Sequence, residues 1–348
     1  MIDRNGYWPR RGHAIMAQHQ SGEQLPPIGL VAGWGSFPVQ VAQSLIREGR
    51  RVCCIAIRGH ASTDLESICD HVTWSGVGKL GGHIRYFRRN GVQQVTMAGK
   101  LFKADILYQG SVWLRHFPDL TCIRTLGPAL LGRQRDARDD SLLVAVTDAY
   151  GRAGMEVLAA TDFAPELLVE AGRLAGPKPK QQQSSDADAG WQVAKQMGGM
   201  DIGQTITIKD GTVIAVEAIE GTDACIERTG DLCRRGGWTL VKVSKPQQDM
   251  RFDVPTIGPQ TVQKVAKANG KAIVIEAGKT ILVERETTLK LAAELGISII
   301  AMNGNMSGNT SGDMNDSMNT ATTQQTPLIA TAELSRHSTR DHLPERAA

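Results

Sequence analysis

Short apolar runs alternate with segments of helical spacing over the first half of the chain. The clearest runs, at residues 28–32, 52–57 and 94–98, have the length and composition of buried strands. The other elements predicted here are helices at 36–48, 79–89 and 140–152 and a strand at 155–160. Strands that alternate with helices predict a parallel sheet covered on both faces, in a first unit at residues 28–160.

A second unit is predicted at residues 161–302, where hairpin signals and strand–helix signals are mixed. Asp210-Gly211 lies between two β-type runs, and Asp-Gly favours the tight turn of a hairpin. The strands predicted here are 204–208, 212–217, 238–243, 272–276, 280–283 and 297–301, and the helices are 191–197, 224–233, 261–269 and 287–295. The chain is therefore predicted to be an α/β protein, with a parallel-sheet domain followed by a distinct mixed α/β domain.

Three segments are polar and show no periodicity. Residues 1–27 are expected to be a disordered N-terminal extension. Residues 303–348 are rich in Asn, Ser, Thr, Gly and Met and are expected to be a disordered, low-complexity tail. Residues 176–190 contain Pro-Lys-Pro-Lys followed by Gln-Gln-Gln-Ser-Ser-Asp, and we expect a polar loop there.

Composition narrows the class of protein. The 348 residues are 41% hydrophobic, which allows two domains with a core each. A net charge of only +3 argues against a dedicated nucleic-acid binder. The six cysteines form no C-x-x-C pair, so we expect reduced thiols in a cytoplasmic protein.

No apolar run is long enough to span a bilayer, and the N-terminus lacks the apolar core of a secretory signal. Any membrane contact is therefore expected to be peripheral. The eight histidines are scattered, and there is no G-x-S-x-G sequence, so Ser/His/Asp catalysis has no support.

A glycine-rich turn, Gly33-Trp34-Gly35-Ser36, follows the first strand and opens the first helix. Glycines at such a turn let the backbone approach a ligand, and free amides at a helix start favour an anion. However, Pro38 replaces the third glycine of the dinucleotide fingerprint, and the Lys-Ser/Thr of a P-loop is missing. A phosphate-binding turn and a plain strand–helix turn both stay open.

Two further charged positions are candidates for substrate binding. Lys100 follows the third strand, at the edge where open α/β sheets bind ligands, although it could equally be a solvated surface lysine. Asp139 and Asp140 begin a predicted helix, where a carboxylate can cap the free amides of the first turn. Because capping explains only one of these acids, a substrate or metal role stays open for the other.

Three acidic residues, Glu217, Glu220 and Asp223, gather where a β-type run ends and a helix begins. Carboxylates are good ligands for Mg²⁺, which also favours substrate phosphates. The alternative is a charged turn with Asp223 in the first turn of a helix, where the helix dipole favours an acid.

A loop of mixed charge at residues 245–258 adds context to this acidic corner. It follows a strand and offers Lys245 and Arg251 as partners for oxyanions and Asp249 and Asp253 as ligands or orienting groups. Acids and bases in this combination are suited to metal-assisted phosphoryl chemistry.

These motifs resemble one family. The N-terminal opening of the LpxI-type UDP-2,3-diacylglucosamine pyrophosphatases of lipid A biosynthesis resembles Ile28-Gly-Leu-Val-Ala-Gly-Trp-Gly-Ser-Phe-Pro38. Their C-terminal half resembles Asp201-Ile-Gly-Gln-Thr205, Val216-Glu-Ala-Ile-Glu-Gly-Thr-Asp223, Lys245-Pro-Gln-Gln-Asp-Met-Arg-Phe-Asp-Val-Pro-Thr-Ile-Gly258 and Glu276-Ala-Gly-Lys-Thr280. The resemblance covers residues 28–302, with the motifs in the family's order. The chain departs from the family in its two terminal extensions and in a longer, more polar 176–190 segment.

The resemblance implies a fold and an activity. The fold is a Rossmann-like N-terminal domain joined to a distinct C-terminal α/β domain. The activity is hydrolysis of the pyrophosphate of UDP-2,3-diacylglucosamine to UMP and 2,3-diacylglucosamine 1-phosphate, with direct attack of water on phosphorus and a divalent cation, usually Mg²⁺. The lipid substrate implies peripheral contact with the cytoplasmic face of the inner membrane, and a homodimer is possible.

The resemblance implies one site residue, and the local motifs predict the others. Asp223 corresponds to the essential aspartate of the family, and with Glu220 or Glu217 it is expected to hold Mg²⁺. Lys245 and Arg251 are expected to stabilise oxyanion charge. The residues expected to bind substrate are Gly33, Trp34, Gly35, Ser36, Lys100, Asp139, Asp140, Gln204 and Thr222.

Two other functions are alternatives. A nicotinamide-dependent oxidoreductase would need an acid at the end of the second strand, whereas the chain has Ile57-Arg58 there. A non-catalytic module would bind UDP-sugars without releasing UMP.

Overall fold

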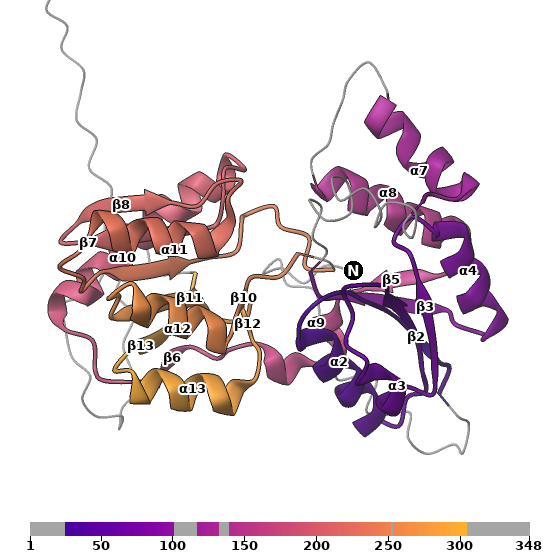
Figure 1. Cartoon of the computed structure of the whole chain (residues 1–348), viewed down its shortest axis with the longest axis horizontal. Coiled ribbons are helices and arrows are strands. Elements are labelled where there is room, and N and C mark those ends of the chain that lie inside the picture. Colours follow the sequence, from indigo (N-terminus) through magenta and orange to yellow (C-terminus); the bar gives the residue numbers. More distant parts are fainter. Residues whose placement is uncertain (1–24, 101–116, 132–138, 252, 305–348) are drawn as a thin grey trace, which may run out of the picture. The chain divides into compact units, whose positions relative to one another are not determined.

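A computed structural model of the chain describes residues 25–100, 117–131, 139–251 and 253–304. It contains two α/β domains, each built around its own sheet (Figure 1). Among these residues, no helix is both long and apolar enough to cross a membrane. The expectations for residues 1–24 and 305–348 lie outside the described part of the chain.

The N-terminal domain is built on a five-stranded parallel sheet of order β3-β2-β1-β4-β5. This is the strand order of a Rossmann-type sheet, so the predicted fold class is confirmed for this domain. Its strands are β1 (Ile28–Ala32), β2 (Val52–Ile57), β3 (His71–Ser75), β4 (Gln94–Ala98) and β5 (Glu156–Leu158).

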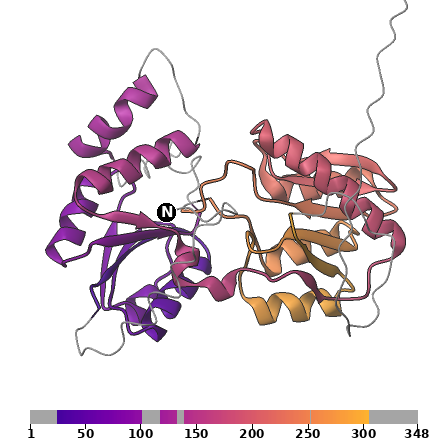
Figure 2. The same cartoon turned by 180° about the vertical axis from the view of Figure 1, so that it is seen from behind.

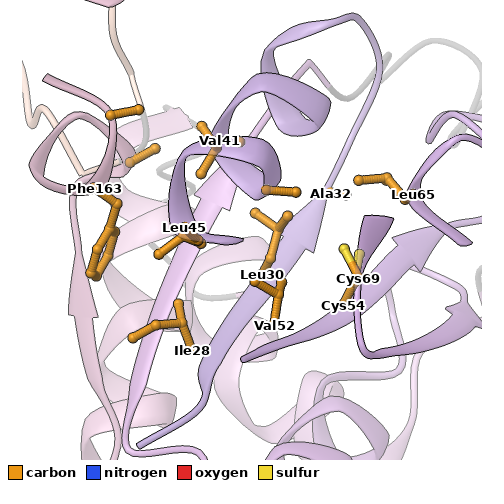
Figure 3. Packing of buried hydrophobic residues seen from close by; sticks show 14 of the residues in the cluster. Ile28, Leu30, Ala32, Val41, Leu45, Val52, Cys54, Leu65, Cys69 and Phe163 are labelled. Carbon is orange, nitrogen blue, oxygen red and sulfur yellow. The ribbon is translucent and has the colours of Figure 1, made fainter. Parts of the chain in front are cut away.

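Alternating side chains of these strands enter two separate cores. Ile28 and Leu30 of β1 and Cys54 of β2 point to the face covered by α2 (Phe37–Arg47), α3 (Leu65–Ile68) and α9 (Ala160–Phe163) (Figure 3). Cys53 and Ile55 point to the other face, which α4 (Leu80–Arg89), α7 (Leu120–Leu131) and α8 (Asp139–Arg152) cover. Both faces are buried, which explains the continuous apolar run of β2.

The structure extends the first unit beyond the expected limit at residue 160. Phe163 and Ala164 are buried in the same core as β1 and α2, and Leu167 of the 3₁₀ helix η2 (Pro165–Leu167) packs against it. Five elements of this domain were also missed from the sequence, namely β3, α3, α7, α9 and η2. The residues of β3 are mostly half-buried, so this strand gives no strong apolar run.

The C-terminal domain is built on a six-stranded mixed sheet of order β6-β13-β11-β9-β7-β8. The three central strands are parallel, whereas β6, β7 and β8 are antiparallel to their neighbours. The strands are β6 (Gly172–Ala175), β7 (Thr205–Lys209), β8 (Thr212–Val216), β9 (Thr239–Lys242), β11 (Ala272–Glu276) and β13 (Ser298–Met302). Two short parallel strands, β10 (Thr256–Ile257) and β12 (Ile281–Leu282), pair separately.

Helices cover both faces of this sheet, as Figure 2 shows from behind. One face packs against α10 (Gln181–Gly199), and the other against α11 (Gly221–Leu232), α12 (Pro259–Lys267) and α13 (Arg285–Glu294). The predicted mixed α/β class is therefore confirmed for the second domain as well.

The expected polar loop at residues 176–190 is wrong from residue 181 onward, where α10 begins. Its sequence is polar because most of its first two turns face solvent. Asp186, however, is 1% exposed and accepts hydrogen bonds from the amides of Asp210 and Gly211 in the β7–β8 turn. The start of this helix is therefore fixed by a contact with a distant hairpin.

Candidate functional site

The acidic corner lies where β8 ends and α11 begins. Glu217 directly follows β8, and Gly221 starts the helix with φ +82°, a backbone conformation that favours glycine. Asp223 lies in the first turn of α11, where the positive end of the helix dipole stabilises a carboxylate. The local sequence thus places the three acids on one short turn, but their carboxylate groups do not meet at one position.

Glu217 is buried and belongs to a chain of three polar side chains. Its Oε1 atom accepts a hydrogen bond from the Thr222 hydroxyl at 2.8 Å, and Lys242 Nζ donates to that hydroxyl at 3.0 Å. Glu217 Oε2 is also buried and has no hydrogen-bond donor in the described part of the chain. Burial lowers the pKa of Lys242, and the charge of Glu217 opposes this shift.

The other two acids of the corner have different partners. Glu220 forms an ion pair with Arg228 at 2.5 Å and accepts a hydrogen bond from the amide of Ala218. Asp223 pairs with Lys264 of α12 at 3.1 Å, and its side chain is 57% exposed. Of the three, Asp223 is the carboxylate most open to a ligand from solvent.

The three carboxylates do not fit the metal site that the sequence predicts. Ligands of Mg²⁺ must converge on one ion at about 2.1 Å. Glu217, Glu220 and Asp223 instead contact a threonine hydroxyl, an arginine and a lysine. No group of three metal-ligating side chains occurs among the residues for which the structure gives positions.

The loop after β9 carries its charges as ion pairs. Lys245 Nζ lies 2.6 Å from Asp201 Oδ1, and the Arg251 guanidinium binds both carboxylate oxygens of Asp249. The hydrogen bonds from Arg251 lower the pKa of Asp249. Both cations are therefore held in place before a substrate binds.

A buried network attaches this loop to the neighbouring strand. Glu276, the last residue of β11, accepts hydrogen bonds from Lys195 Nζ at 2.6 Å and from the Ser244 amide at 2.8 Å. Gln248 Oε1 accepts from the Lys245 amide, and its Nε2 donates to Gln204 Oε1 at 3.4 Å. Gln204, a predicted substrate-binding residue, thus contacts the loop.

The glycine turn brings two backbones of the N-terminal domain together. The Gly33 amide donates to Ala98 O, and Trp34 and Lys100 exchange two backbone hydrogen bonds. A Cβ atom on Gly33 would lie 2.7 Å from Lys100 O, so glycine is required there for close approach. The amides of Gly33 and Trp34, which were expected to face a ligand, are therefore already used.

The structure also gives the positions of the other substrate-binding residues predicted in the N-terminal domain. Gly35, with φ +105°, and Ser36 precede α2, and no backbone hydrogen bond from their amides occurs within the described residues. The backbone of Lys100 follows β4 as predicted, and the residue is exposed. Asp139 and Asp140 begin α8 as predicted, but their side chains lie outside the described residues.

Three polar residues of the C-terminal domain were missed by the sequence prediction of site residues. Lys242 lies in an apolar run and Lys195 lies in a helix. At neither position does the sequence indicate that the lysine is buried. Glu276 could have been identified from the sequence, because it opens the quoted Glu-Ala-Gly-Lys-Thr motif at the end of a predicted strand. All three lie close to the carboxyl ends of parallel strands, where open α/β sheets bind ligands.

Comparison with known proteins matches both domains. Residues 27–167 match the family model of the LpxI N-terminal domain, and residues 170–300 match that of the LpxI C-terminal domain. The chain is 32% identical over 283 residues to the UDP-2,3-diacylglucosamine pyrophosphatase LpxI of Caulobacter vibrioides. The alignment covers 79% of this chain and 97% of that protein.

Proposed function

The chain belongs to the LpxI family, and from this premise we propose that it hydrolyses the pyrophosphate bond of UDP-2,3-diacylglucosamine, a step of lipid A biosynthesis. The products are UMP and 2,3-diacylglucosamine 1-phosphate. The observation that carries this proposal is the match to a pyrophosphatase over 97% of its length, with both domains in the same order.

In the proposed reaction, the oxygen of water bonds to a phosphorus of the diphosphate, and the bond from that phosphorus to the bridging oxygen breaks. Asp223 is the residue that we expect to act on this water. Its carboxylate is 57% exposed, so it can reach a bound substrate, and among the described residues its ion-pair partner is Lys264, which the substrate would displace. A positioned carboxylate can orient water and accept its proton.

The cations of the loop after β9 would then bind the diphosphate oxygens. Lys245 and Arg251 are paired with Asp201 and Asp249, and a diphosphate carries more negative charge than either carboxylate. Exchange of these partners for the substrate would place two cations on the developing oxyanion.

We further propose that hydrolysis needs a divalent cation. A diphosphate is itself a good ligand for Mg²⁺, which keeps several waters and few protein ligands at phosphate sites. Such a cation would neutralise phosphate charge when bound. No protein ligand is assigned, since the three acids of the corner do not converge.

Three more proposals concern the uridine diphosphate end of the substrate, the contact with the membrane and the oligomeric state. The amides of Gly35 and Ser36 would hold the uridine diphosphate end, and the protein would meet its substrate at the cytoplasmic face of the inner membrane. Sedimentation with phospholipid vesicles tests the membrane contact. Analytical ultracentrifugation tests whether the protein is a homodimer.

Release of UMP from UDP-2,3-diacylglucosamine tests the proposed function, with and without EDTA. Asp223→Asn keeps the volume and loses the charge, so we expect turnover to fall by roughly 100-fold or more. Asp231→Asn, which changes an exposed acid of the same helix, is the matched control and should keep normal turnover. Full activity of the Asp223 variant would refute the role of Asp223, and full activity in EDTA would refute the need for a cation.

The same assay separates the two alternatives. A non-catalytic UDP-sugar-binding module would bind the substrate and release no UMP. A nicotinamide oxidoreductase would bind NADH, for which the exposed Arg58 after β2 offers no acidic partner to the ribose.

A further inference from the structure

Lys242 occupies the position in the C-terminal sheet where a ligand is expected. It is the last residue of β9, and its neighbour β11 runs parallel to it. Successive side chains of a strand alternate between faces, so Lys242 shares a face with Leu240, which packs in the core under α11 and α12. This explains why its ammonium reaches Thr222 at the start of α11.

The ammonium of Lys242 is buried but only partly bonded. The residue is 6% exposed, and an ammonium has three N–H donors. Within the described part of the chain, one hydrogen bond uses these donors, the bond to the Thr222 hydroxyl. Burial of a charged group with open donors is costly, and proteins retain such groups mainly at functional sites.

The alternative explanation for a buried lysine at this position is that it neutralises the charge of Glu217. A lysine with that role would contact the carboxylate directly. In the described residues no ion pair joins Lys242 to Glu217, because the Thr222 hydroxyl stands between them, donating to one and accepting from the other. Glu217 Oε2, in turn, is buried without a donor. The geometry is that of a lysine held in place, with donors left for another anion.

We propose that Lys242 is a catalytic residue that binds a non-bridging phosphate oxygen of the diphosphate, and that Thr222 and Glu217 are positioning residues that hold its ammonium. The proposal rests on the proposed function and adds a residue to it. The ammonium stabilises negative charge that grows on the phosphate oxygens as water attacks, and its buried surroundings strengthen that interaction.

Lys242→Met tests this role, since it removes the charge and keeps the length of an unbranched side chain. We expect kcat for UMP release to fall about 100-fold, the typical cost of losing one oxyanion donor. Lys209→Met is the matched control, because Lys209 is a half-buried lysine of β7 that donates to the carbonyl of Gly236. It should keep kcat within about threefold.

Calorimetric titration with inorganic pyrophosphate gives a readout that does not depend on turnover. Lys242→Met should weaken binding about tenfold or more, and Lys209→Met should not. For the positioning role, Thr222→Val should lower kcat, and Thr222→Ser, which keeps the hydroxyl, should restore most of it.

The double variant Lys242→Met/Glu217→Gln separates catalysis from charge balance. It removes both charges. It should therefore fold even if the uncompensated charge of Glu217 prevents Lys242→Met alone from folding, and we expect the double variant to remain inactive. Recovery of activity or of pyrophosphate binding in the double variant would overturn the proposal, as would normal kcat in Lys242→Met. If the wild-type protein released no UMP, the proposed function would fail, and the pyrophosphate titration would still test the binding site.

Discussion

The carboxylate of Glu276 at the end of β11 contacts three donors although it is almost fully buried. Lys195 and the Ser244 amide bind one oxygen, and Lys279 lies 3.2 Å from the other. Lys195 also donates to Ser244 O at 2.8 Å. At the scale of single residues, this acid therefore fixes the start of the loop that carries Lys245.

Loss of the Glu276 charge should destabilise the C-terminal domain. Glu276→Gln leaves the ammonium of Lys195 without a charged partner in a mostly buried position, which should cost about 2 kcal/mol of unfolding free energy. Urea denaturation measures this. Glu294→Gln is the control, because it breaks only the exposed pair with Lys290 and should cost less than about 0.5 kcal/mol. Equal midpoints for the two variants would contradict the prediction.

A buried histidine of the N-terminal domain should make stability depend on pH. His83 is 4% exposed, its Nε2 donates to Gly76 O at 3.1 Å, and burial lowers its pKa from 6.5 to about 4. Because the unfolded chain binds this proton more readily, the contribution of His83 is full above pH 6.5. It is lost as the pH falls from 6.5 towards 4, by about 2 kcal/mol at pH 5.

Thermal or urea unfolding at pH 7 and pH 5 measures this effect. His83→Gln can still donate to Gly76 O and does not titrate, so its stability should fall less than that of the wild type over this range. His71→Gln changes an exposed histidine and should behave as the wild type does. An identical pH dependence of His83→Gln and wild type would show that another group is responsible.

At the scale of elements, α10 illustrates how a polar segment becomes a helix. Its residue Gly190 lies against the sheet, where a Cβ atom would be 2.7 Å from Val241 Cγ2. Glycine lowers the intrinsic stability of a helix, yet here it allows close packing. The Gln183 side chain accepts from the Lys180 amide and caps the first turn.

Asp186 should be the residue that most strongly connects α10 to the β7–β8 hairpin. Asp186→Ala removes the acceptor for the amides of Asp210 and Gly211, at 3.1 Å and 2.7 Å, and should cost about 2 kcal/mol. Asp188→Ala changes an exposed acid two residues further along the same helix and should cost less than about 0.5 kcal/mol. Hydrogen exchange of the hairpin amides checks the mechanism, because faster exchange is expected only in the Asp186 variant.

At the scale of the whole molecule, the matched family segments account for residues 27–167 and 170–300. A chain reduced to residues 25–304 retains both segments and all the proposed site residues. We therefore expect its kcat/KM for UMP release to stay within about threefold of the full chain. A loss of more than about tenfold, with an unchanged melting temperature, would instead give the removed segments a part in substrate binding.

Much of the fold could be predicted from the sequence, since an apolar run shows burial of a strand whatever its partners are. The bounds of β1, β2, β4 and β11 agree with the predicted strands. The predicted Asp210-Gly211 hairpin is confirmed, and the family resemblance is confirmed by the comparisons. These features depend on local patterns and on motifs that are continuous in the chain.

The partners of charged side chains could not be predicted in the same way. Sequence spacing brought Glu217, Glu220 and Asp223 into one turn, but the structure gave each a different partner, Thr222 and Arg228 of α11 for the first two and Lys264 of α12 for the third. It also buried Lys242, a residue that spacing does not distinguish from a solvated lysine. Such contacts depend on which strands and helices pack together far apart in sequence, and a local pattern carries no information about that.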